Sequence, residues 1–246
     1  MKIIERPSPN FNERQNGGPV DILVMHYTGM PDAESAMKLL TTVEGKVSSH
    51  YTIDEDGTIY RHVPEELRAW QAGVSSWFDA TDINSRSIGI EIVNPGHEWG
   101  YRPFPPAQIA AVIDISKGIL KRWPITPARV VAHSDIAPNR KIDPGELFPW
   151  DELARHGIGR WPSAHLKIGP APTLVVGSEG DDVKRLQSDL ARYGYGVEAT
   201  GLYDERTLIV VSAFQRHFRR SNFDGLADAE TLAILADLLN QLDAVS

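Results

Sequence analysis

The sequence predicts an α/β fold in which a mixed central β-sheet is flanked by helices, followed by a small C-terminal domain of three helices. Three observations support this prediction. Apolar runs of strand length alternate with helical patterns in residues 1–150, one hairpin pattern requires an antiparallel strand pair, and three short helical patterns follow a Pro- and Gly-rich segment near the C-terminus.

The first element in chain order is the near-continuous apolar run DILVMHY, residues 21–27. Such a run predicts a buried central strand, because a strand covered on both faces carries apolar side chains throughout. His26 lies at its C-terminal end, where the side chains of an α/β sheet commonly line a cleft. Residues 32–43 then predict a helix that packs on the sheet, with Asp32 as its N-cap.

A hairpin and an aromatic loop follow this helix. The run SSHYTIDEDGTIYRHV, residues 48–63, predicts two strands joined around Asp56-Gly57, a pair that tolerates the positive φ of a tight turn. The loop WQAGVSSW, residues 70–77, carries Trp70 and Trp77. An aromatic side chain on a loop either contacts a ligand or anchors the loop to the core, and the sequence leaves both interpretations open.

An acidic residue interrupts the next strand-like run, SIGIEIVN, residues 87–94. A carboxylate buried without a partner in a sheet is costly or changes its pKa, so Glu91 is either paired or functional. Residues 105–123 predict an amphipathic helix that opens on two prolines and has a structural role.

The stretch VVAHSDIAPNRKIDPGELFPW, residues 130–150, begins as a β-branched strand that ends at His133. Its Pro and Asp content then predicts an irregular loop, which carries Lys141 and Asp143. An imidazole and a carboxylate in this position could bind one divalent metal, since zinc accepts both nitrogen and carboxylate oxygen. His26 is the candidate for a third ligand from elsewhere in the chain.

The C-terminal part differs in composition from the rest. Residues 161–176 are rich in Pro and Gly and lack helical periodicity, which indicates a linker between a domain at 1–160 and a helical domain at 177–246. Within the helical domain, GLYDERTLIVVSAFQ and GLADAETLAILADLL match at corresponding positions. This self-similarity predicts a repeated turn-helix unit.

Composition limits the classes of protein that this chain could represent. The 246 residues have a formal net charge of -8, and no cluster of Lys and Arg suits a phosphate backbone, so nucleic acid is not expected as a partner. The chain has no cysteine, and therefore any metal must be bound by His and carboxylate. Neither a signal peptide nor a membrane span is visible, which favours a cytoplasmic protein; a periplasmic or wall-associated location by an unrecognised route is the alternative.

Spacing alone leaves the metal site undecided, because a histidine at a strand end is more often a structural residue. If His26, His133 and Asp143 did bind zinc, the ion would keep an open position for water. Glu91 could then take a proton from that water, and Lys141 could stabilise the oxyanion formed when the water attacks a carbonyl.

Five blocks in order resemble the zinc-dependent N-acetylmuramoyl-L-alanine amidases of the type 2 amidase family, which includes peptidoglycan recognition proteins. The blocks, over about residues 15–155, are VMHYTG, SSHYTIDEDGTIYRHV, AWQAGVSSW, SIGIEIVN and VAHSDIAPNRKIDPGELFPW. The resemblance implies an amidase fold of the peptidoglycan-recognition type. It also implies zinc ligands at His26, His133 and Asp143, a catalytic acid/base at Glu91 and an intermediate-stabilising residue at Lys141.

The expected substrate is peptidoglycan or a muropeptide, cleaved between N-acetylmuramic acid, in its ordinary or its 1,6-anhydro form, and L-alanine. We expect cleft-lining positions at Trp70, Trp77, Asn84 and Arg140. Gln71 and Asn139 depart from residues frequent in the family, His and Gly respectively, and these departures bear on substrate preference rather than on the ligands.

Three further histidines stay outside the predicted metal set. His50 matches a family histidine but is expected to orient other residues or to pack, and His62 and His97 have no supporting neighbours in the sequence and are expected at the surface.

The C-terminal 65 or so residues resemble a small peptidoglycan-binding domain, although their apolar pattern alone would also suit a solubilising or oligomer-forming helical module. A non-catalytic peptidoglycan recognition protein is the alternative function. It is disfavoured because every ligand position is kept. A peptidase is disfavoured by the lack of an H-E-x-x-H helix. The sequence indicates no oligomeric state.

Overall fold

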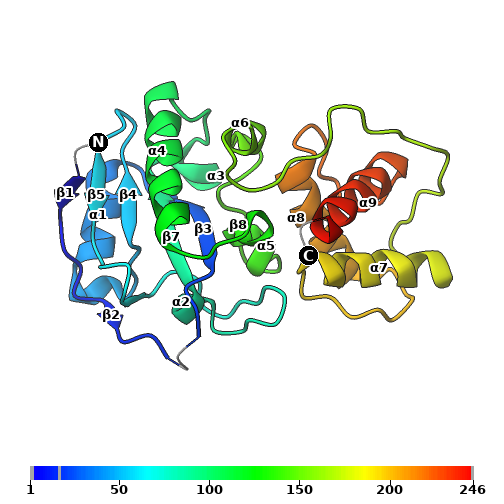
Figure 1. Cartoon of the computed structure of the whole chain (residues 1–246), viewed down its shortest axis with the longest axis horizontal. Coiled ribbons are helices and arrows are strands. Elements are labelled where there is room, and N and C mark those ends of the chain that lie inside the picture. Colours follow the sequence, from blue (N-terminus) through cyan, green and yellow to red (C-terminus); the bar gives the residue numbers. More distant parts are fainter. Residues whose placement is uncertain (1–2, 16–17, 245–246) are drawn as a thin grey trace.

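A six-stranded mixed sheet forms the centre of the N-terminal part in the computed structural model, which describes residues 3–15 and 18–244 (Figure 1). Its strands, in spatial order, are β1 (Ile3–Glu5), β5 (Ile59–Arg61), β4 (Tyr51–Ile53), β7 (Ser87–Ile92), β3 (Ile22–Tyr27) and β8 (Val130–Ala132). Two short strands, β2 (Phe11–Asn12) and β6 (Arg68–Ala69), pair separately. The predicted mixed sheet is confirmed, since among the described strands of the six-stranded sheet β4 and β5 pair antiparallel and the other neighbours pair parallel.

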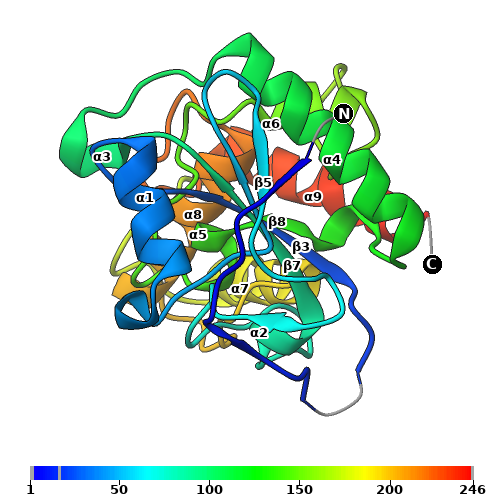
Figure 2. The same cartoon turned by 90° about the vertical axis from the view of Figure 1, so that its left-hand side faces the viewer.

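Helices cover this sheet, as predicted (Figure 2). The longest of them is the predicted amphipathic helix, α4, and the others are short. The helical segments are α1 (Ala33–Thr41), η1 (Val43–Gly45), α2 (Ile83–Arg86), α3 (Gly96–Trp99), α4 (Pro106–Arg122), η2 (Pro127–Arg129), α5 (His133–Ile136) and α6 (Trp150–Arg155). Asp32 caps α1 as expected, because its carboxylate accepts a hydrogen bond from the Ser35 amide.

Strand β3 divides its side chains between two hydrophobic cores, as the period-2 alternation of a strand requires. Leu23 and Met25 belong to the core that contains the buried face of α4. Ile22 and Val24 belong to a second core that continues into the C-terminal helices. Both faces of β3 are therefore buried, which explains its unbroken apolar sequence.

Up to residue 244, the last one described, the C-terminal part consists of three helices, as predicted: α7 (Asp181–Tyr193), α8 (Glu205–Phe218) and α9 (Ala229–Asp243). The sequence repeat corresponds to a repeated structure. Gln187 donates to the carbonyl of Leu202 and to Thr207, and Gln215 makes the equivalent bonds one repeat later, to Leu226 and Thr231. Asp204 and Asp228 cap α8 and α9 by accepting from the amides of the same threonines.

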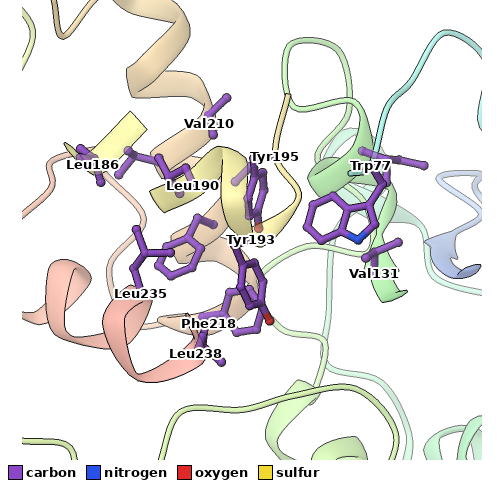
Figure 3. Close-up of a cluster of buried hydrophobic side chains, with 14 of the residues drawn as sticks. Trp77, Val131, Leu186, Leu190, Tyr193, Tyr195, Val210, Phe218, Leu235 and Leu238 are labelled. Atoms are coloured by element: carbon purple, nitrogen blue, oxygen red, sulfur yellow. The ribbon is translucent and has the colours of Figure 1, made fainter. Parts of the chain in front are cut away.

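The N-terminal and C-terminal parts share one continuous hydrophobic core (Figure 3). Trp77 belongs to this core and contacts both parts: it is 1% exposed, its ring lies edge-on to Tyr195 at 4.9 Å, and its indole N–H donates to the Ala128 carbonyl. Gly194 is required beside it, because a Cβ there would approach the indole to 2.7 Å and the φ of Gly194 is +128°. The predicted cleft-lining position of Trp77 is therefore wrong, and the anchoring interpretation is the correct one.

The secondary structure predicted after β8 is also wrong. The chain after β8 does not become irregular at once, because residues 133–136 form one helical turn, α5. The Asp135 carboxylate stabilises this turn by accepting a hydrogen bond from the Ala132 amide at 2.7 Å. None of the helices in the described residues combines the length and the apolar character needed to cross a bilayer.

Candidate active site

The parallel register of three neighbouring strands brings the predicted site residues to one edge of the sheet. His26 of β3 is paired with Glu91 of β7, and the Met25–Ala132 pairing of β3 with β8 places His133 at the level of His26. Because these strands run in the same direction, their C-terminal ends present side chains to the same cleft. Positions far apart in sequence therefore meet in space.

Three buried side chains converge at this edge. The Nδ1 atoms of His26 and His133 lie 3.0 Å apart, and each lies 3.1 Å from Oδ2 of Asp143. The three residues are 1%, 3% and 6% exposed. Together they form a group able to hold a metal ion.

The geometry of these three atoms suits a tetrahedral ion. Bonds of about 2.0–2.1 Å to such an ion keep neighbouring ligand atoms roughly 3.3 Å apart, close to the observed triangle. His133 Nε2 lies 3.3 Å from the Ala72 carbonyl, so we place the proton on Nε2, which leaves the Nδ1 lone pair directed at the centre of the triangle. Burial alone would raise the pKa of Asp143, but His133 and His26 bring that pKa well below its usual range. Asp143 is therefore ionised, as a carboxylate ligand of a metal must be.

Glu91 borders the same cleft and has one carboxylate oxygen, Oε2, that is buried without a hydrogen-bond partner. Burial raises its pKa to about 7; His26 and Lys141 lower the pKa and Asp143 raises it. A carboxyl group with a pKa near neutrality can both accept and return a proton at neutral pH. The sequence left open whether Glu91 is paired or functional, and its unpaired oxygen favours a functional role.

A cleft of about 490 Å³ lies over these residues. Lys141, Trp70 and Arg140 also border it, as predicted. Trp70 is held there by a 2.7 Å hydrogen bond from its indole to Asn12. The guanidinium of Arg140 donates to the carbonyls of Ala72 and Val74, so Arg140 fixes the loop beside the cleft.

Asn84 does not line the cleft, which corrects a second predicted position. It is 8% exposed, and its side-chain oxygen accepts from the amides of Gln71 and Ala72 at 3.0 and 2.8 Å. Asn84 therefore holds the loop that follows Trp70. Gln71 itself reaches the cleft and donates to Ser87.

The remaining histidines have defined neighbours. His50 is fully buried, accepts from the Gly89 amide and contacts the Leu67 carbonyl, which agrees with a packing or orienting role. The predicted surface position of His62 is wrong. The residue is only 2% exposed, and its ring forms hydrogen bonds with Thr52 and with the Arg6 carbonyl. His97 is exposed as predicted, although it does have neighbours: its ring bonds Tyr27 and Glu146.

Sequence reasoning missed a buried polar cluster behind the site. Asp135, two residues after His133, is 1% exposed and accepts from Tyr195 Oη at 2.7 Å and from His217 Nδ1 at 2.6 Å. Tyr195 and His217 belong to the C-terminal part, so this part directly supports the turn that carries His133. An Asp at the third position of a helical turn was a visible capping signal, but its partners lie 60 and 82 residues away in sequence.

Two family models match the chain. Residues 16–146 match the model described as N-acetylmuramoyl-L-alanine amidase, and residues 179–235 match the model described as putative peptidoglycan binding domain. The first match covers all five residues placed at the candidate site.

Similar proteins with known names cover most of the chain. The N-acetylmuramoyl-L-alanine amidase AmiD of Escherichia coli is 43% identical over 238 residues, which are 90% of this chain and 83% of AmiD. The 1,6-anhydro-N-acetylmuramyl-L-alanine amidase AmpD of Haemophilus influenzae is 33% identical over 58% of this chain and 86% of AmpD.

Solved structures agree with these relatives. The complex of E. coli AmiD with anhydro-N-acetylmuramic acid-L-Ala-D-γ-Glu-L-Lys has a TM-score of 0.79 at 40% identity, covering 94% of this chain and 98% of AmiD. AMPDH3 of Pseudomonas aeruginosa, in complex with an anhydromuramic pentapeptide, has a TM-score of 0.80 at 37% identity, covering 93% and 94% of the two chains.

Proposed function

The chain belongs to the N-acetylmuramoyl-L-alanine amidase family, and from this premise we propose that it hydrolyses the amide bond between anhydro-N-acetylmuramic acid and L-alanine in muropeptides, with zinc as its metal. The bound substrates of similar structures, an anhydromuramyl tripeptide in AmiD and an anhydromuramic pentapeptide in AMPDH3, support this choice of substrate.

One observation supports this proposal above the others. The two Nδ1 atoms and the Asp143 oxygen form a buried triangle with sides of 3.0–3.1 Å at the floor of the cleft. Glu91 lies opposite His26 in the register of the neighbouring strand. Two nitrogens and one oxygen are a donor set that zinc accepts. A purely structural cluster would not need an unpaired carboxylate oxygen beside it.

In the proposed reaction, a zinc ion held by His26, His133 and Asp143 would act as a Lewis acid and acidify water. Glu91 takes the proton of the attacking water, and it later returns a proton to the amine of the leaving L-alanine. Lys141 stabilises the negative charge that develops on the carbonyl oxygen. Trp70 closes one wall of the cleft.

The experiment compares the wild-type chain with Glu91→Gln, a substitution of nearly equal volume. Peptide release from anhydro-N-acetylmuramic acid-L-Ala-D-γ-Glu-L-Lys is followed by chromatography, and zinc content is measured in the same samples. We expect a loss of at least about 100-fold in kcat with zinc retained, because proton transfer by a positioned side chain contributes 10²–10⁴-fold. An unchanged rate would be incompatible with the proposed role of Glu91.

A non-catalytic recognition protein is the alternative function. The retained ligands and acid/base argue against it, and the two functions differ in a measurable way. A chain that binds less than about half an equivalent of zinc and that binds the muropeptide without cleaving it would support recognition rather than hydrolysis.

We also propose that the chain consists of two domains, residues 1–160 and 177–246, joined by a linker at 161–176. We further propose that the protein acts in the cytoplasm on soluble muropeptides. Cell fractionation, with parallel assays on anhydro-muropeptide and intact sacculi, tests the location. Activity confined to an envelope fraction and to sacculi would contradict it.

A further inference from the structure

A second cavity, of about 920 Å³, lies between the N-terminal and C-terminal parts and shares no lining residue with the active-site cleft. We call it the interdomain cavity. Its walls come from α6, residues 159–166, the end of α8 and α9. Four arginines and two carboxylates border it, which makes it cationic in a chain of net charge -8.

Arg160 distinguishes this cavity from an ordinary gap between domains. Arg160 is only 8% exposed, and its Nε atom is buried without a hydrogen-bond partner. Within the described residues its guanidinium forms no ion pair. Burial raises the pKa of the nearby Tyr193 hydroxyl, whereas the positive charge of Arg160 lowers that pKa. The neutral phenol does not balance the charge of the guanidinium. A buried guanidinium without a counter-ion is costly, so a ligand anion would stabilise it.

The other three arginines of the cavity are already paired. Arg155 and Arg220 each bond Asp151 at 2.5 Å, and Arg219 bonds Asp228 at 2.6 Å and Glu230 at 3.3 Å. Among the residues that the structure describes, Arg160 is therefore the one of these four arginines without an ion pair. A guanidinium offers two parallel donors, which fit the two oxygens of a carboxylate.

The cavity wall next to Arg160 is aromatic and is held in place. The Trp161 carbonyl accepts a hydrogen bond from Gln241, and both the amide and the hydroxyl of Ser163 donate to Asp237. The guanidinium of Arg220 lies 5.6 Å from the centre of the Trp161 ring. These contacts connect residues 161–163 to α9, so the ligand would meet a preformed site.

We propose that the interdomain cavity binds a free carboxylate of a peptidoglycan stem peptide, with Arg160 as the anchoring cation and Trp161 as the wall for the apolar part of the peptide. This inference rests on the proposed function, which supplies the peptide. A γ-linked glutamate keeps its α-carboxylate free, and 920 Å³ greatly exceeds the size of a small inorganic anion. A second peptide site would strengthen binding to cross-linked soluble muropeptides, which carry more than one stem peptide.

Nuclear magnetic resonance of the indole N–H signals tests the proposal on the zinc-loaded full chain. The probe is the free tripeptide L-Ala-D-γ-Glu-L-Lys, which has no muramyl bond to cleave. Trp161 reports on the interdomain cavity and Trp70 on the active-site cleft, and the variants Trp161→Phe and Trp70→Phe assign their signals. We expect a saturable shift of the Trp161 signal, and no such shift with a peptide whose carboxylates are amidated.

Two variants separate a specific anchor from general charge. Arg160→Met should weaken binding at the Trp161 signal at least about ten-fold, because it removes a bidentate charge-assisted contact. Arg155→Met makes the same charge change at an exposed, already paired arginine of the same cavity and should weaken binding less than about two-fold. Equal losses in the two variants would overturn the proposal.

Other outcomes are equally decisive. A shift of Trp70 alone would overturn the second site while leaving the proposed amidase function intact, which the peptide-release assay tests separately. If acetate shifted Trp161 as strongly as the tripeptide, the cavity would be a small-anion site and the proposal would be wrong. Arg160→Met should melt at or above the wild-type temperature, since Arg160 has no partner to lose; a lower melting temperature would assign it a structural role instead.

Discussion

Removing the Tyr195 hydroxyl should weaken the link between the C-terminal helices and the turn that carries His133. The hydroxyl donates to the Asp135 carboxylate at 2.7 Å, and both residues are 2% exposed or less. A hydrogen bond to a charged group contributes about 1.5–3 kcal/mol. Tyr195→Phe should therefore lower the free energy of unfolding by that amount, which corresponds to roughly 3–12 °C in melting temperature for a chain of this size.

Tyr203→Phe is the matched control. Tyr203 is also fully buried, but its hydroxyl donates to a neutral carbonyl, that of Gly225, within the C-terminal part. We expect this variant to lose only about 0.5–1.5 kcal/mol. Urea unfolding of the wild type and both variants at fixed zinc concentration gives the free energies. Hydrogen exchange of the Ala132 amide, which donates to Asp135, reports on the turn itself.

The refuting result follows from this comparison. If Tyr195→Phe loses no more stability than Tyr203→Phe, and the Ala132 amide exchanges at the same rate in both variants, then Asp135 does not transmit support from the C-terminal helices to α5. If the exchange at Ala132 accelerates in Tyr195→Phe alone, the helices belong to the structural support of the site.

Three further predictions concern the core, the metal and pH. Trp77→Ala should destabilise the chain by about 3–5 kcal/mol in urea unfolding, since it leaves a large cavity in the shared core. A loss below about 0.5 kcal/mol, which is usual for a surface site, would contradict its role in this core. Adding zinc to chelator-treated protein should raise the melting temperature in proportion to the logarithm of zinc concentration, and His133→Ala should abolish this dependence. Burial lowers the pKa of His50 to about 3, so the unfolded state binds more protons below pH 6.5 and stability should fall with decreasing pH, by up to about 1.4 kcal/mol per pH unit. His50→Gln should flatten this slope between pH 6.5 and 4.5, and an unchanged slope would show that other groups cause it.

The local sequence was sufficient to predict several main elements of the fold. The run that became β3 is apolar throughout because both of its faces are buried, and the period of α4 records a helix with one buried face. The repeated Gly-Leu, Asp and Thr positions before α8 and α9 encode caps that form within a few residues. Patterns of this kind can be read because their causes lie within one or two turns of chain.

The candidate site could be predicted only in part from the sequence. His26, Glu91, His133, Lys141 and Asp143 stand in ordered blocks, and the structure brings all five to one cleft. The register of three parallel strands does this, and spacing along the chain alone did not imply it.

What the tertiary structure alone decided is the position of side chains whose partners are distant in sequence. Trp70 and Trp77 belong to the same loop, yet one borders the cleft and the other is buried against Tyr195, more than 100 residues later. Local patterns also do not predict that His217 supports Asp135, or that Arg160 has no ion pair among the described residues. The physical reason is that burial and pairing depend on which surfaces meet after folding, whereas periodicity records only which face of an element is apolar.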